Sequence, residues 1–222
     1  MEIAGKLTIK DWAELEKKLI IDNDENWGLA FHFFEERIRT RYLNPINAIL
    51  EMDLKTGEGF AVVNLQCSLI ETIESFINGW IYHNDGEKKS KKGWFKNKVS
   101  DETYIIEINN NLYIFESFFK NHLNFKGING NDFYFNVRCS LLHETQTKNN
   151  WKIKKGLKFG KIFKEKDNFK IIYRDNFQRD LEKTINLYKT AIIKGQKFNN
   201  IESKELRENF KAKFNHICEK SN

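Results

Sequence analysis

The sequence predicts a mainly α protein, a helical bundle with a small β-hairpin and two C-terminal helices. Apolar residues recur at every third or fourth position over most of the chain, which is the spacing of amphipathic helices. One proline and 12 glycines among 222 residues argue against a loop-rich or many-stranded chain. A single domain (1–222) is expected, with a bundle core at 8–148 and, packed on it, the hairpin and two helices at 149–222.

The first helices are predicted from their caps and apolar faces. Thr8, with Asp11 three residues later, is a variant capping box that marks the start of the first helix. A second amphipathic helix is predicted over residues 27–42, where aromatic residues follow one face. Asn44 followed by Pro45 has the pattern of an N-cap with proline at the first helical position, and this predicts a short third helix. The 19 phenylalanines of the chain predict an aromatic-rich core.

The most apolar stretch, residues 60–82, predicts a central helix that is buried on most sides. Glu71 and Glu74 lie within it, and we expect them to be exposed or paired. Residues 83–100 are expected to form a lysine-rich loop, whose two aromatic residues suit either single-stranded nucleic acid or, more simply, a solvated loop with an apolar anchor. Another helix is predicted over residues 111–123, with these residues facing inward: Leu112, Phe115, Phe119 and Leu123.

Residues 131–148 predict the helix around which the chain is organised. Asn131 is its expected N-cap. Arg138 and His143 interrupt a mostly apolar sequence, and a permanent cation and an imidazole are costly inside a core unless they are paired. Five residues apart on a helix, their side chains point about 140° apart. We therefore expect them to converge only through the length of Arg138, or across the axis of a homodimer.

Alternation of apolar residues with lysines at residues 151–154 and 169–173 predicts a hairpin that turns near residues 165–168. Lysines crowd this region with little acid beside them, which makes it the best local candidate for contact with a polyanion such as RNA. Lysines also protect edge strands from aggregation, so the pattern has a second explanation. The residues predicted to bind nucleic acid are Lys148, Lys152, Lys154, Lys155 and Lys158.

Several kinds of site lack their sequence signature. No glycine-rich phosphate loop occurs, and the five histidines and three cysteines have no spacing typical of zinc ligands, so we expect no metal and no cofactor. The net charge of +6 fits an RNA partner or simply a lysine-rich surface. Because the first residues lack the apolar run of a signal peptide, and no stretch approaches the ~18 apolar residues of a membrane span, we expect a cytoplasmic protein without membrane contact.

Cys139 and His143 support one further interpretation, since residues four apart share a helix face and a thiol beside an imidazole can act as a nucleophile. A cysteine on an apolar row is more often part of the core.

The motif Arg138-Cys139-Ser140-Leu141-Leu142-His143, an Arg-x4-His on a long helix of a basic helical bundle, resembles the motif of the HEPN superfamily. Residues 59–71 together with this motif are similar to a set of uncharacterised bacterial proteins. The resemblance covers residues 8–148. It implies a bundle that dimerises across the motif helix. It also implies a metal-independent endoribonuclease of bacterial toxin–antitoxin or antiphage systems, with an antitoxin or defence-system partner.

The resemblance also implies roles for four residues. An RNA 2′-hydroxyl attacks the adjacent phosphorus, His143 is the general base or acid, and Arg138 holds the phosphate. Ser140 and Glu144 orient this pair. The alternatives are a non-catalytic HEPN-like module that binds RNA or protein, and a structural role in which the motif side chains pair with Glu71, Glu74 or helix carbonyls.

Overall fold

The computed structural model describes residues 1–54, 56–83, 93–96, 111–157 and 159–220. These residues are mainly helical with small sheets, which confirms the predicted fold class. The chain divides into two compact units, each made of stretches that are separated in sequence. Unit 1 comprises Met1–Arg41, Thr72–Asn111 and Asn186–Asn222, and unit 2 comprises Tyr42–Glu71 and Leu112–Ile185. Whether the chain forms the single domain expected from its sequence stays a prediction.

Two long helices, α4 (Glu58–Asn78) and α8 (Arg174–Ile193), contribute residues to both units. Unit 1 also contains β1 (Glu2–Ala4), β2 (Leu7–Thr8), α1 (Ile9–Glu16), α2 (Trp27–Ile38), β3 (Trp80–His83), β4 (Gly93–Lys96) and α9 (Ser203–Lys220). The expected start of α1 is confirmed. Thr8 Oγ1 accepts from the Asp11 backbone N–H over 3.3 Å, and Asp11 Oδ2 accepts from the Thr8 N–H over 2.8 Å.

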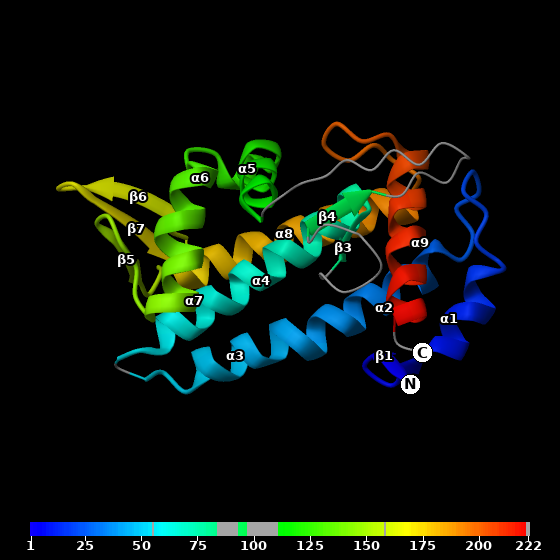
Figure 1. Ribbon diagram of the computed structural model, residues 1–222, viewed down its shortest axis with the longest axis horizontal. Coiled ribbons are helices and arrows are strands. Elements are labelled where there is room, and N and C mark those ends of the chain that lie inside the picture. Colours follow the sequence, from blue (N-terminus) through cyan, green and yellow to red (C-terminus); the bar gives the residue numbers. More distant parts are fainter. Residues whose placement is uncertain (55, 84–92, 97–110, 158, 221–222) are drawn as a thin grey trace. The chain divides into compact units, whose positions relative to one another are not determined.

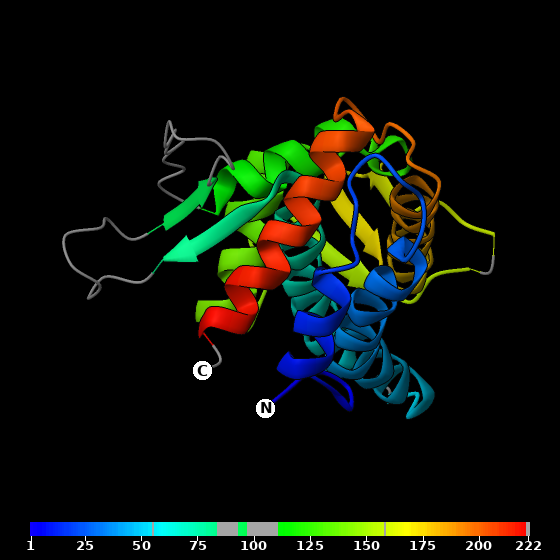
Figure 2. The ribbon, with the colours of Figure 1, turned by 90° about the vertical axis from the view of Figure 1, so that its right-hand side faces the viewer.

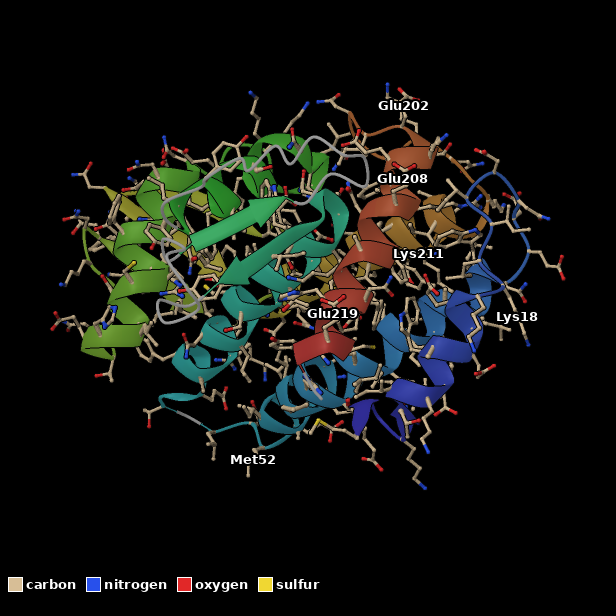
Figure 3. All side chains as sticks on the ribbon, turned by 45° about the vertical axis from the view of Figure 1, so that its right-hand side comes forward. Lys18, Met52, Glu202, Glu208, Lys211 and Glu219 are labelled. Atoms are coloured by element: carbon tan, nitrogen blue, oxygen red, sulfur yellow. The ribbon has the colours of Figure 1, made fainter. Side chains whose placement is uncertain are left out.

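The core of unit 1 is aromatic, as the phenylalanine content predicts. Phe34 and Phe76 have ring centroids 4.8 Å apart, and Trp12 stacks on Phe214 at 4.5 Å. Edge and offset ring contacts of this kind add to the free energy gained by burying the rings. Figure 3 labels Lys211 on α9, and this side chain forms an ion pair with Glu16 of α1 at 2.8 Å.

The helix predicted over residues 60–82 ends earlier than expected, because Gly79 adopts a left-handed φ of +68° and stops α4 at Asn78. Trp80 therefore begins β3, which pairs antiparallel with β4 (Figure 2). The prediction of a loop across residues 83–100 was wrong for Gly93–Lys96, which form β4. Its remaining lysine-rich residues from 84 to 92 and from 97 to 100 lie outside the described residues.

The π-helix η1 (Arg39–Leu43) lies between α2 and α3 (Asn44–Glu51). Leu43 has helical dihedral angles, so Asn44 is not the N-cap that the sequence predicts. Proline lacks an N–H and crowds the carbonyl of the preceding turn. The wider π turn accommodates Pro45 without ending the helix.

Unit 2 contains α3, the first part of α4 and these further elements: α5 (Leu112–Asn121), η2 (Leu123–Phe125), α6 (Gly130–Phe133), η3 (Tyr134–Cys139), α7 (Ser140–Glu144), β5 (Trp151–Lys154), β6 (Phe163–Lys166) and β7 (Phe169–Tyr173). Its buried rings cluster as Phe115, Phe118, Phe119, Phe125, Phe133 and Phe177. Leu123 was predicted to face inward but is 72% exposed, because α5 ends before it.

The strands β5, β6 and β7 form one sheet in the order β5-β7-β6, beside α6 and α7 in Figure 1. β6 and β7 form a hairpin at the expected turn, which is made by Asp167 and Asn168, both with positive φ. β5 was expected to belong to that hairpin but instead pairs parallel with β7. The sheet therefore has three strands, and the segment between β5 and β6 connects its two edges.

Candidate functional site

The predicted motif helix is present as three consecutive segments, α6, η3 and α7. Asn129, not Asn131, caps it, since the Asn129 side chain accepts from the backbone N–H of Asp132 over 2.9 Å. The helix ends at Glu144 and not near residue 148, because Thr145 takes a left-handed φ of 55°. Arg138 lies in the π segment η3, while His143 lies in the last turn of α7.

Arg138 is held by α4. Its Nε donates a hydrogen bond to Glu71 Oε1 over 2.9 Å, and the two side chains are 18% and 17% exposed. Burial alone would lower the pKa of Arg138, but the charge of Glu71 and their hydrogen bond raise it above its ordinary value. Glu71 was expected to be exposed or paired, and its ion pair with Arg138 confirms this. Glu74 is buried, and its Oε1 accepts from the Asn78 amide over 3.1 Å.

The other three motif side chains are not brought to Arg138. Within the described part of the chain, exposed His143 makes no hydrogen bond and no ion pair. Ser140 is buried, and its hydroxyl donates to the carbonyl oxygen of Phe135 over 2.9 Å. Glu144 forms an exposed ion pair with Lys148 at 3.4 Å. Arg138 and Ser140 therefore make contacts that stabilise the helix: Arg138 with Glu71, and Ser140 with the Phe135 carbonyl.

Cys139 is half-buried, next to Tyr134. Burial, and then the hydrogen bond with Cys139, raise the pKa of Tyr134 to about 12. Cys67 on α4 is fully buried, and burial raises the pKa of its thiol well above the ordinary value. Cys139 therefore contacts Tyr134 within the motif helix and keeps partial contact with solvent.

The sheet of unit 2 has one buried and one exposed face. On the exposed side, the alternation of the strands places exposed lysines along both edges and, along the central strand, half-buried Phe169 and Tyr173 with buried Ile171 between them. We call this surface the lysine face. It consists of Lys152 and Lys154 on β5, Lys164 and Lys166 on β6, and Phe169, Ile171 and Tyr173 on β7.

Register aligns the members of the lysine face in rows. Lys152 and Lys164 flank Ile171 from the two edges, and Lys154 lies beside Tyr173. All the lysines of this face are exposed, and the rings of Phe169 and Tyr173 are half-buried. Lys152 Nζ lies 3.1 Å from the ring centroid of Phe169. The Lys152 ammonium group thus lies over the Phe169 ring, while Lys154 lies beside Tyr173.

Ion pairing divides the lysines of this region into two groups. Three lysines away from the lysine face have acidic partners: Lys148 with Glu144, Lys155 with Asp53 and Lys170 with Asp132. Lys161, which is also outside the face, forms no ion pair within the described residues. On the face, Lys166 has only a distant contact with Asp167 at 3.7 Å, and within the parts of the chain that the structure places, Lys152, Lys154 and Lys164 form no ion pair. Among the described lysines of this region, most of the uncompensated positive charge therefore lies on the lysine face.

The buried face of the sheet packs on α6. Trp151 Nε1 donates to Asp132 Oδ2 over 3.0 Å, and Lys170 Nζ donates to the same oxygen over 2.7 Å. The Trp151 ring also meets Phe133 edge-on at 5.7 Å. These contacts fix the inner side of β5 and β7, so that alternation turns Lys152 and Lys154 outward.

Of the five lysines predicted to bind nucleic acid, the structure places Lys152 and Lys154 on the lysine face. Lys148 and Lys155 are paired elsewhere, and Lys158 lies outside the described residues. Sequence reasoning missed the two aromatic members and β6. The alternation of Phe163-Lys164-Glu165-Lys166 is the signal that could have found β6.

Two further observations bear on what the chain can hold. Among the residues that are described, no three His, Cys, Asp or Glu side chains gather in a way that could hold a metal ion. The helix α4 is long and apolar enough to cross a membrane by length and composition, but 61% of that window is buried inside the protein, as in the core helix of many soluble proteins. The predictions on metals, cofactors, membranes and localisation stay predictions.

Comparison of the chain with protein-family models, with curated proteins and with solved structures found no match in any of the three.

Proposed function

We propose that this protein binds RNA through the lysine face and acts as a non-catalytic binding module. The observation that carries the proposal is the concentration of unpaired lysines around half-buried aromatic rings on one exposed sheet face. Lysine ammonium groups neutralise backbone phosphates and release their counterions, which supplies affinity for any strand. Aromatic rings on a sheet offer bases a surface for stacking, and this favours single strands over duplexes.

The test compares charge reversal on and off the lysine face. Lys152→Glu with Lys154→Glu reverses two unpaired charges on β5. Lys10→Glu with Lys204→Glu is the matched control. Both lysines are exposed in unit 1, and replacing them changes the net charge by the same amount. Fluorescence anisotropy with a single-stranded RNA is expected to show a loss of affinity of at least tenfold for the first variant and little change for the control.

Salt dependence adds a second readout to the same test. Each phosphate neutralised on a single strand contributes about −0.7 to the slope of log K against log salt. Removing two lysine contacts is therefore expected to make the slope less steep by about 1.4. Equal loss in both double variants would show a non-specific effect of net charge and contradict the assignment to the lysine face.

A metal-independent endoribonuclease is the second candidate, favoured by one observation. His143 is exposed and, in the part of the chain that is placed, has no partner that would occupy its imidazole. Arg138 is engaged by Glu71, so the proposed pair would form only if a phosphate draws Arg138 away from that carboxylate. RNA cleavage in EDTA by wild type and His143→Ala, at matched oligomeric state, tests it. Loss of cleavage in the variant supports catalysis, and equal cleavage excludes a role for His143.

The biological setting implied by the resemblance, toxin–antitoxin or antiphage defence with a homodimer and a partner protein, stays a proposal. Phe135 and Leu142 on the motif helix are 51% and 50% exposed, which makes that surface the first to examine if the protein proves dimeric.

A further inference from the structure

A cavity of about 280 Å³ opens at one end of the lysine face. The described residues that line it are Leu157, Gly160, Lys161, Lys164 and Tyr173, all within unit 2. Lys164 and Tyr173 belong to the lysine face, and the other three come from the segment that connects β5 to β6. The cavity is therefore continuous with the surface proposed to bind RNA.

Among the described residues, the lining combines the aromatic ring of Tyr173 with the two lysines. Tyr173 is half-buried, and within the described ranges its hydroxyl makes no hydrogen bond and its ring contacts no other ring. Leu157, 76% exposed, supplies a second apolar surface. Gly160 contributes backbone only, and a Cβ at this position would lie 2.7 Å from the Asn176 amide. An apolar slot bounded by a ring suits a flat, aromatic ligand.

The two lysines of the lining indicate that such a ligand carries a negative charge. Lys161 and Lys164 line the cavity, and neither forms an ion pair in the parts of the chain that the structure describes. Unpaired ammonium groups beside an aromatic slot complement a planar base joined to a phosphate. The volume is slightly below the ~300 Å³ at which pockets for drug-sized ligands begin, so it suits one base and not a stack of several.

We propose that this cavity receives one unstacked base of a single-stranded RNA, stacked on Tyr173, with the adjacent phosphates at Lys161 and Lys164. The inference rests on the proposed function and extends it: the ligand is a single strand of RNA, and the protein recognises it by binding one of its bases. Single-stranded RNA is the form whose bases can be splayed out and stacked on side chains. The continuity of the cavity with the lysine face favours a nucleic-acid strand over a lipid surface, which would contact the exposed Leu157 without entering the slot.

The experiment measures binding of two oligonucleotides of equal length, one single-stranded RNA and one with the same sugar–phosphate backbone but no bases. Tyr173→Leu removes the ring, Tyr173→Phe keeps it, and Phe135→Leu is a control at an exposed ring on the motif helix. Tyr173→Leu is expected to weaken RNA binding about tenfold and to leave binding of the abasic strand unchanged. Tyr173→Phe and Phe135→Leu are expected to match wild type.

The outcomes separate this inference from the proposed function. If Lys152→Glu with Lys154→Glu weakens binding but Tyr173→Leu does not, the lysine face binds RNA and the base cavity is refuted. If Tyr173→Leu weakens binding of both oligonucleotides equally, Tyr173 acts on the fold and the inference is overturned. The Tyr173→Phe variant reports whether the ring alone is enough for binding. If wild type binds vesicles containing phosphatidylserine and neither oligonucleotide, the lysine face serves a lipid surface, and both proposals fall.

Discussion

Glu71 of α4 and Arg138 of η3 form a hydrogen-bonded ion pair in which Nε and Oε1 are 2.9 Å apart. The residues are 67 positions apart in the sequence, so this pair ties two distant helical segments of unit 2 together. It also fixes the orientation of the first residue of the Arg-x4-His motif, whereas His143 at the other end stays exposed. Because Arg138 is paired with Glu71 while His143 is exposed, a structural role for Arg138 explains the geometry better than a preformed catalytic pair of Arg138 and His143.

Glu71→Ala is therefore expected to destabilise the protein by about 1–2 kcal/mol, below the 3–5 kcal/mol typical of breaking a fully buried pair because both side chains keep some solvent contact. Arg138 would be left partly buried without its carboxylate. Urea unfolding of wild type and variant measures the difference. Glu144→Ala, which breaks the exposed pair with Lys148, is the control and should cost less than about 0.5 kcal/mol. Equal effects would mean that the Glu71 contact has no stabilising role.

Asp132→Ala is expected to loosen the sheet that carries the lysine face. Asp132 Oδ2 accepts from both Trp151 and Lys170, so the change leaves an indole N–H and an ammonium group without their acceptor. The expected loss in the free energy of unfolding is about 2 kcal/mol. Chemical denaturation measures it, and Asp22→Ala, an exposed substitution in unit 1, should stay within about 0.5 kcal/mol of wild type. An Asp132→Ala variant as stable as its control would show that packing of Trp151 alone holds the sheet.

The elements that the sequence predicts well have signals that act over a few residues. The Thr8 capping box and the hairpin turn at Asp167-Asn168 depend on local hydrogen bonds and on residues that tolerate positive φ. Two features needed the tertiary structure. The π turn that accommodates Pro45 leaves no pattern in apolar spacing, and the end of α4 at Gly79 is stabilised by α9, where Asn209 donates to the Ile77 carbonyl.

The candidate site follows the same division. Periodicity identified β5 and β7, because alternation is a property of each strand alone. It could not show that β5 pairs parallel with β7, and this pairing is what brings Lys154 beside Tyr173. Spacing placed Arg138 and His143 on one helix, but the partner of Arg138 comes from a distant helix that only the fold brings near.

Lys213 on α9 is expected to make stability depend on pH. Burial, and then the charge of Arg37, lower the pKa of Lys213 to about 7, against an ordinary value of 10.5. Between these values the unfolded chain binds a proton that the folded protein does not, so the contribution of Lys213 to the free energy of unfolding rises with pH. Below about pH 7 both states are protonated and this slope disappears.

Lys213→Met removes the titrating group, so the stability of wild type relative to the variant should increase from about pH 7 upward, by at most about 1.4 kcal/mol per pH unit. Urea unfolding at several pH values between neutral and mildly alkaline measures both proteins. Lys204→Met, at an exposed position at the start of α9, is expected to follow wild type at every pH. Parallel stability curves for wild type and Lys213→Met would show that Lys213 does not titrate in this range.

The three cysteines are expected to react with a thiol reagent at very different rates in the folded protein. Thiolate is the reactive form, and burial raises the pKa of both Cys67 and Cys218, which are also only 1% and 8% exposed. Half-buried Cys139 should therefore label first. Cys139→Ser is expected to abolish the fast phase, Cys67→Ser to leave it intact, and labelling in urea to reach all three thiols of wild type. A fast phase that survives in Cys139→Ser would place the reactive thiol on another element and contradict the burial of Cys67 or Cys218.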